Sequence, residues 1–176
     1  MDAPVVQERF SFPFSDLRNS KLAIDFMNIF MISYRYVDVY LCKKFENTEE
    51  RFKEWLNVFN ECLDHFSNNK MKIIIVVDKF KDKESIPENE IRTCKDRKNI
   101  RLSRKNLEIV KNVCESKGIK WFCVDYADRK LSQLFSAGRC DYIMTYDKKI
   151  AGEKIQIAAS SKLIGFPLGH WWHPNM

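Results

Sequence analysis

Three short apolar runs of this chain each end on an aspartate, and this repeated pattern limits the folds that the chain can adopt. Residues 22–24 precede Asp25, residues 73–77 precede Asp78, and residues 142–146 precede Asp147. The unbroken isoleucines and valines of the second run are typical of a parallel strand covered on both faces. Because neighbouring parallel strands end at the same edge of a sheet, this pattern predicts a row of carboxylates along one edge.

Strands and helices are expected to alternate along the chain. We expect strands at 22–26, 72–77, 119–124, 141–145 and 154–159, and helices at 29–44, 48–68, 102–117 and 128–137. Acids in the first turn after Asn47 mark one helix start, and Gly118 marks one helix end. Such a chain predicts an α/β fold with a mostly parallel central sheet between two layers of helices, a three-layer α/β/α sandwich.

Length and composition indicate one globular domain, with residues 1–20 as an N-terminal extension and 21–176 as the domain. The net charge of +6 mildly favours a polyanionic partner. The six cysteines show no C-x-x-C spacing, which favours a reducing intracellular compartment, cytoplasmic or nuclear. No apolar run approaches the roughly 20 residues of a membrane span, so no membrane association is expected.

The acidic edge predicts a metal site. Asp25, Asp78 and Asp147 follow strands, Asp128 opens the helix after the third strand, and Asp125 lies close before it. Converging carboxylates raise one another's pKa unless a divalent ion holds them ionised. Mg²⁺ or Mn²⁺, as one ion or as two, suits oxygen ligands and supports phosphodiester hydrolysis. A single aspartate at a strand end is more often a cap or turn residue, so the prediction depends on all four in this order.

The segments 22–28, 76–78 and 127–147 together resemble the PIN-domain superfamily, in its flap-endonuclease-like (XPG-like) branch. The first strand is similar also to that of the herpesvirus host-shutoff RNA endonuclease. The resemblance extends over roughly residues 20–160, although each motif alone is short. It implies a PIN-like fold in which Asp25, Asp78, Asp128 and Asp147 bind two Mg²⁺ or Mn²⁺ ions and act in cleavage.

Two positions depart from the family pattern. Tyr126 stands where the family usually has a second carboxylate, and Asp125 is a possible substitute; Lys149 stands where another acid is usual. The resemblance therefore implies a complete first metal position and a depleted second one. It does not include the helical duplex-clamping region of flap endonucleases, so RNA or single strands are expected in preference to DNA flaps.

Many basic residues lie between positions 79 and 111, where the family has an arch that grips phosphates. The residues expected to contact nucleic acid are Lys83, Arg92, Lys95, Arg97 and Arg101. Such contacts give salt-dependent, sequence-independent affinity. A solvated helix face with mixed ion pairs is an equally good interpretation of any one of these residues.

The C-terminal sequence His170-Trp171-Trp172-His173 offers too few ligands for a zinc site. The two tryptophans are expected to pack on the sheet, and if exposed they would stack on bases or bind a protein partner.

The sequence thus predicts a metal-dependent nuclease, with internal cleavage of single-stranded RNA favoured over DNA. Two alternatives stay open. A catalytically degenerate PIN-like module would bind nucleic acid or a protein without cleavage, and a phosphate-handling α/β enzyme would act on small phosphoesters.

Overall fold

The computed structural model describes residues 14–41, 44–45, 47–79, 102–147 and 163–166. In chain order the elements are η1 (Phe14–Leu17), β1 (Lys21–Asp25), α2 (Phe26–Leu41), α3 (Thr48–Asn68), β2 (Lys72–Asp78), α4 (Arg104–Ser116), β3 (Lys120–Val124), α5 (Ala127–Ser136), β4 (Tyr142–Met144) and β5 (Leu163–Ile164).

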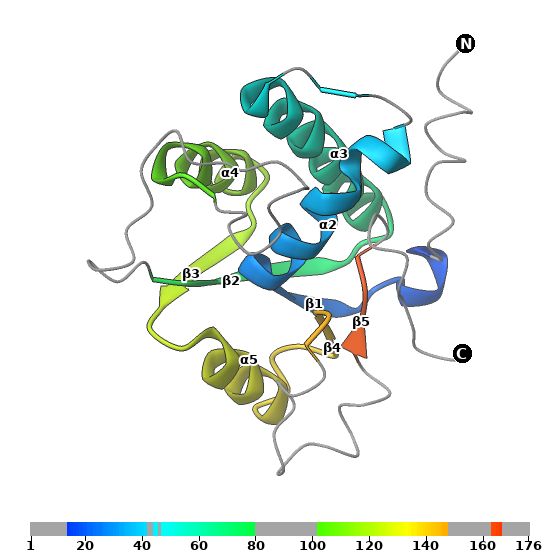
Figure 1. Ribbon diagram of the computed structural model, residues 1–176. Coiled ribbons are helices and arrows are strands. Elements are labelled where there is room, and N and C mark those ends of the chain that lie inside the picture. Colours follow the sequence, from blue (N-terminus) through cyan, green and yellow to red (C-terminus); the bar gives the residue numbers. More distant parts are fainter. Residues whose placement is uncertain (1–13, 42–43, 46, 80–101, 148–162, 167–176) are drawn as a thin grey trace.

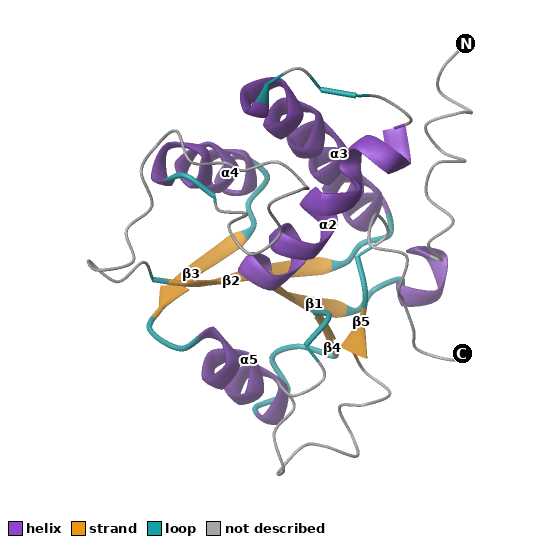
Figure 2. Ribbon diagram, in the orientation of Figure 1, coloured by secondary structure: helices purple, strands orange, loops and turns teal. Residues whose placement is uncertain are grey.

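The described strands form one parallel sheet in the order β3-β2-β1-β4-β5. Helices α2, α3 and α4 lie on one face of this sheet, and α5 lies on the other (Figures 1 and 2). The burial follows the alternation of a strand, since Leu22 and Ile24 pack on the first face and Ala23 packs toward α5. The predicted three-layer α/β/α sandwich is therefore confirmed.

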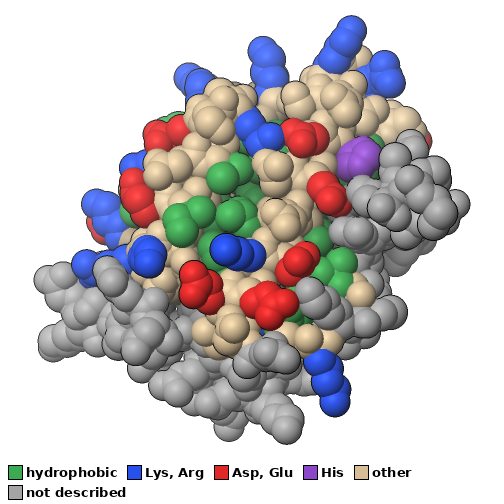
Figure 3. All heavy atoms as spheres, turned by 90° about the horizontal axis from the view of Figure 1, so that it is seen from above, with side chains coloured by type: hydrophobic (Ala, Val, Ile, Leu, Met, Phe, Trp, Pro, Cys, Tyr) green, Lys and Arg blue, Asp and Glu red, His purple; other side chains and the backbone are tan. Residues whose placement is uncertain are grey.

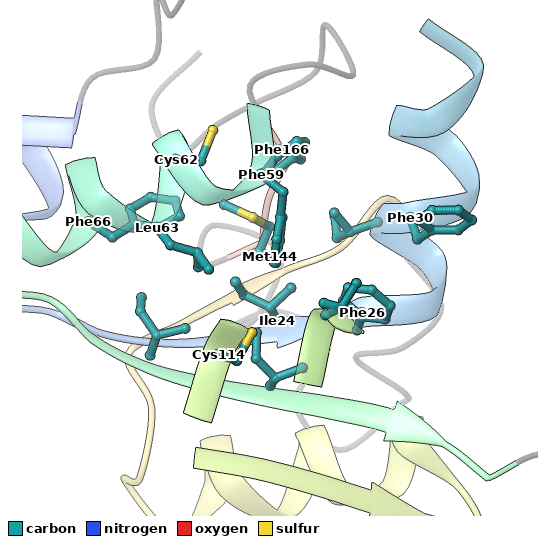
Figure 4. Close-up of a cluster of buried hydrophobic side chains, with 14 of the residues drawn as sticks. Ile24, Phe26, Phe30, Phe59, Cys62, Leu63, Phe66, Cys114, Met144 and Phe166 are labelled. Carbon is teal, nitrogen blue, oxygen red and sulfur yellow. The ribbon is translucent and has the colours of Figure 1, made fainter. Parts of the chain in front are cut away.

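The larger core lies between the sheet and the three helices, and it is rich in aromatic rings. Phe26 and Trp55 meet edge to face with centroids 6.1 Å apart, and Trp55 stacks on Phe59 at 4.9 Å. Figure 4 shows Ile24 of β1 in the same cluster as Phe26 of α2 and Phe59 of α3. This packing fixes β1, and with it the position of the aspartate that ends the strand.

The boundaries agree with the sequence to within a few residues. Asn47 caps α3 as expected, because its side chain accepts a hydrogen bond from the Glu50 N–H at 2.7 Å. Gly118 adopts φ +74° just after α4, a conformation that suits glycine. Helix α2 begins at Phe26, three residues earlier than expected, because no loop separates it from β1.

The fifth strand predicted at 154–159 lies outside the described residues, as does the N-terminal part of the predicted extension. Within the described chain, β4 pairs with β1 on one side and with β5, at the end of the sheet, on the other. Figure 3 looks down on the side of the molecule that carries α2, α3 and α4, where side chains of both charges surround a small hydrophobic area. No helix in the described ranges has the length and apolarity needed to cross a membrane.

Candidate metal centre

The carboxyl ends of the strands place the predicted acids at one edge of the sheet. Asp25 is the last residue of β1 and Asp78 the last of β2. Because Asp25 pairs with Val76, β2 extends two residues beyond β1. Asp128 lies in the first turn of α5, and Asp147 follows β4 by three residues.

Asp25 lies at the centre of this arrangement, with a side chain that is only 7% exposed. The Thr145 hydroxyl lies 2.9 Å from Asp25 Oδ2 and donates a hydrogen bond to it. The pKa of Asp25 is raised to about 7, chiefly by burial and also by the negative charges of Asp78, Asp147 and Asp128, while the Thr145 hydrogen bond opposes the rise. The structure thus places Asp25 where the charges of the other three predicted acids act on its buried carboxyl.

Asn28 organises the edge, and the sequence interpretation gave it no role of its own. Its Oδ1 accepts the Tyr146 N–H at 2.7 Å and lies 3.1 Å from the Thr145 hydroxyl. The Asp147 N–H in turn donates to the Thr145 hydroxyl at 3.1 Å. The first turn of α2 therefore holds the loop after β4 beside Asp25. The sequence signal that could have identified Asn28 was its spacing of three residues from Asp25. Asp25 directly precedes α2 and Asn28 lies in the first turn of α2, so the two residues lie close together.

Asp78 has a structural partner at the start of α5. Its Oδ1 accepts the Ala127 N–H at 2.7 Å, while the side chain of Tyr126, the N-cap residue, makes no capping hydrogen bond. Tyr126 instead lies exposed, with the Arg129 guanidinium 4.5 Å from its ring centroid. An acid from β2 thus takes over the capping role of the residue before the helix. Tyr126 supplies no carboxylate at the position where the resemblance implies a second one.

The remaining predicted acids are exposed. Asp128 Oδ1 accepts the N–H of Arg129 at 2.9 Å. Asp125 Oδ1 lies 3.8 Å from the ammonium of Lys79, and both side chains are well exposed, so this ion pair contributes little stability. The charges that raise the pKa of Asp25 are those of the other three acids, and Asp125 is not among them.

The edge suits a hydrated hard cation. Its side-chain donors are carboxylate, amide and hydroxyl oxygens, the ligand type of Mg²⁺ and Mn²⁺. In the part of the chain that the structure describes, no three His, Cys, Asp or Glu side chains lie close enough together to ligate a single ion. Mg²⁺ commonly uses one or two carboxylates and several waters, so the arrangement fits such an ion and does not fit a zinc site.

Several predicted residues lie outside the described ranges. These are Lys83, Arg92, Lys95, Arg97, Arg101, Lys149, His170, Trp171, Trp172 and His173. Their proposed contacts with nucleic acid or with a protein partner stay predictions.

Solved structures with a similar architecture include a flap endonuclease and the catalytic core of Rad2. Flap endonuclease-1 from Methanococcus jannaschii aligns with 90% of this chain at a TM-score of 0.60 and 15% identity. The catalytic core of Rad2, solved in complex with a DNA substrate, aligns with 84% of it at a TM-score of 0.51 and 14% identity. The chain has the PIN-like fold of flap endonucleases.

This PIN-like chain spans about half the length of those two structures, 56% of the first and 45% of the second. At such low identity the likeness establishes the fold and leaves activity and substrate to be argued from the site. No protein-family model matches the sequence, and no curated protein matches it either. The similarity to the herpesvirus host-shutoff endonuclease stays a prediction.

Proposed function

We propose that this chain is a metal-dependent nuclease that hydrolyses phosphodiester bonds at the acidic edge of its sheet. The observation that carries the proposal is the buried Asp25 carboxyl, whose pKa is raised to about 7 by burial and by three neighbouring acids. Such an arrangement is costly for a protein that binds no cation there. A divalent ion would offset that cost and would attract the phosphate of a substrate.

Some residues at this edge would ligate the ion, and others would position those ligands. Asp25 and Asp147 would ligate the ion from β1 and from the loop after β4, and Thr145 orients the Asp25 carboxylate. Asp78 has one oxygen engaged by α5, which leaves its other oxygen for the ion or its waters. When bound, Mg²⁺ or Mn²⁺ supplies Lewis-acid chemistry toward the phosphate.

We propose single-stranded RNA, cut internally, as the substrate. The support is the resemblance of the first strand to an RNA endonuclease and the abundance of lysine and arginine between positions 79 and 111. Because one of the similar structures was solved with a DNA substrate, DNA of the same sequence is the necessary comparison. Free thiols at Cys114, Cys123 and Cys140 accord with an intracellular location, which we also propose.

The test is cleavage of a labelled circular single-stranded RNA in Mn²⁺, with EDTA and circular DNA in parallel arms. A circle has no ends, so only an endonuclease can open it. Asp25→Asn and Asp78→Asn should each lower the rate by roughly 100-fold or more, since each removes a ligating charge. The matched control is Asp64→Asn, which removes an exposed carboxylate on α3. An unchanged rate in Asp25→Asn would overturn the metal mechanism.

The alternative function is a degenerate PIN-like module that binds nucleic acid without cutting it. Three features favour it: Asp78 is partly engaged as a cap, Tyr126 replaces a carboxylate, and no three-ligand group exists among the described residues. Retention of labelled RNA in a gel-shift experiment with Mn²⁺, with no product after prolonged incubation, would select this alternative.

A further inference from the structure

A cavity of about 570 Å³ lies at the edge of the sheet where the strands begin. Its walls come from the starts of β1, β2 and β3, from the end of α3, and from the turns after α4 and α5. Lys72 and Asp78 are the first and last residues of β2, which puts them about 20 Å apart at ~3.3 Å per residue. The cavity is therefore separate from the candidate metal centre.

Positive charge dominates the lining of this cavity. The basic lining residues are Lys21, Lys72, Lys117, Lys120 and Arg139, and Asp64 is the acidic one. Lys21 and Lys72 are register partners on neighbouring strands. Lys120 pairs with Ile74, two residues after Lys72, so the three lysines leave the same face of the sheet. Like charges at paired positions of neighbouring strands repel one another.

Two nearby acids, Asp64 and Asp141, offset part of this positive charge. Asp64 Oδ1 lies 2.6 Å from the ammonium of Lys117, and the Asp141 carboxylate accepts the backbone N–H of Lys21 at 2.9 Å. Within the described ranges, the ammonium groups of Lys72 and Lys120 and the guanidinium of Arg139 have no ion-pair partner. These cations leave the cavity with an excess of positive charge that an anion would neutralise.

The rest of the lining is mostly apolar. The apolar side chains are Leu63, Met71, Ile73, Ile74, Ile119, Phe122 and Leu134. Phe122 and Ile74 are only partly buried, so part of this apolar lining is accessible. A concave site of several hundred Å³ that combines apolar side chains with charged groups is able to hold a small molecule with an apolar part and a charged part.

We propose that this cavity binds a nucleoside diphosphate or triphosphate. The aromatic base would lie against the apolar lining, and the phosphates would contact the lysines at the strand starts. A nucleic-acid backbone matches the cavity less well, because phosphates and sugars would leave the apolar lining without a partner. The proposal assigns this edge a role that is independent of cleavage at the acidic edge.

The experiment is a calorimetric titration of the full chain with ADP at low ionic strength in EDTA. Pyrophosphate supplies the charge without the base in a second arm, and adenosine supplies the base without the charge in a third. ADP should bind at least tenfold more tightly than either. The double variant Lys21→Gln with Lys72→Gln should weaken ADP binding at least tenfold. The control, Lys53→Gln with Lys105→Gln, removes two exposed lysines outside the cavity and should change it less than twofold.

Several results would overturn the proposal. The first three are the absence of heat on titration with ADP, equal effects of the two double variants on ADP binding, and pyrophosphate binding as tight as that of ADP. The fourth is a cavity variant that loses affinity for single-stranded RNA but keeps its affinity for ADP. Asp25→Asn should bind ADP as the wild type does. If the chain cleaves nucleic acid but does not bind ADP, only this proposal is wrong. If it binds ADP but does not cleave nucleic acid, only the nuclease proposal is wrong.

Discussion

Asp25 combines two properties: it is buried, and the charges of three other acids act on it. Burial favours its neutral form, and so do the neighbouring charges. The Thr145 hydroxyl donates to it and opposes both effects in part. The residue is thus placed to lose its proton when a cation arrives, which couples ion binding to pH.

The same raised pKa makes a prediction about stability in EDTA. An aspartate ionises near pH 4 in the unfolded chain and at about pH 7 in the folded one, so the folded state holds the proton more tightly. The free energy of unfolding therefore falls as pH rises from about 4 to about 7. Asp25→Asn removes this loss, and at pH 8 it should be more stable than the wild type by on the order of 1–4 kcal/mol. Urea denaturation at pH 4.5 and pH 8 measures the difference.

Asp64→Asn is the control, because its carboxylate is exposed and should alter the pH profile little. A wild-type profile that stays flat between pH 4.5 and pH 8 would show that Asp25 ionises at its ordinary pKa in the folded protein.

At the scale of elements, α5 depends on a residue from another strand. Asp78 accepts a hydrogen bond from the Ala127 N–H at 2.7 Å, and its negative charge lies at the positive, N-terminal end of the α5 dipole. Asp78→Ala should lower the free energy of unfolding by about 1 kcal/mol, as loss of a capping residue does. Asp78→Asn keeps an acceptor oxygen and should lose less. Thermal denaturation of both variants measures the cost.

Comparison with cleavage separates the two roles of Asp78. Both substitutions should abolish activity if the carboxylate helps to hold the ion, whereas a purely structural role predicts more activity in Asp78→Asn than in Asp78→Ala. Equal stability of the two variants would show that the hydrogen bond to Ala127 does not stabilise α5.

The element boundaries were largely predictable because their signals are local. The uninterrupted apolar run before Asp78 predicted β2, and Asn47 predicted the start of α3. The hydrogen bonds of Asn28 were not predictable, because their partners are more than a hundred residues away along the chain. Local patterns gave the position of Asp25 at a strand end and could not give its burial.

At the scale of the whole molecule, the acidic edge could be predicted from the sequence on a single assumption, that the strands are parallel. The resemblance to PIN-like nucleases then supplied the order of the acids, and the structure confirms the fold. The basic cavity was missed, because Lys21, Lys72 and Lys120 come together only when β1, β2 and β3 are neighbours. Strand order has no periodic signal, so properties that depend on it required the structure.

Ion binding should be visible in the stability of the entire domain. A ligand that binds only the folded state adds about 2.7 kcal/mol at a concentration of 100 times its Kd. For a chain of this size, that gain corresponds to a rise in Tm of roughly 5–10 °C. Because the ion needs an ionised Asp25, saturating Mn²⁺ should raise Tm at pH 8 and should raise it much less at pH 5.5, below the pKa of about 7.

Differential scanning fluorimetry with Mn²⁺ or EDTA at the two pH values measures this gain, and Asp25→Asn should lose it at pH 8. A gain of equal size in Asp25→Asn would place the ion elsewhere on the protein. A wild-type gain without cleavage of either RNA or DNA would favour the alternative of a binding module that holds an ion and does not cut.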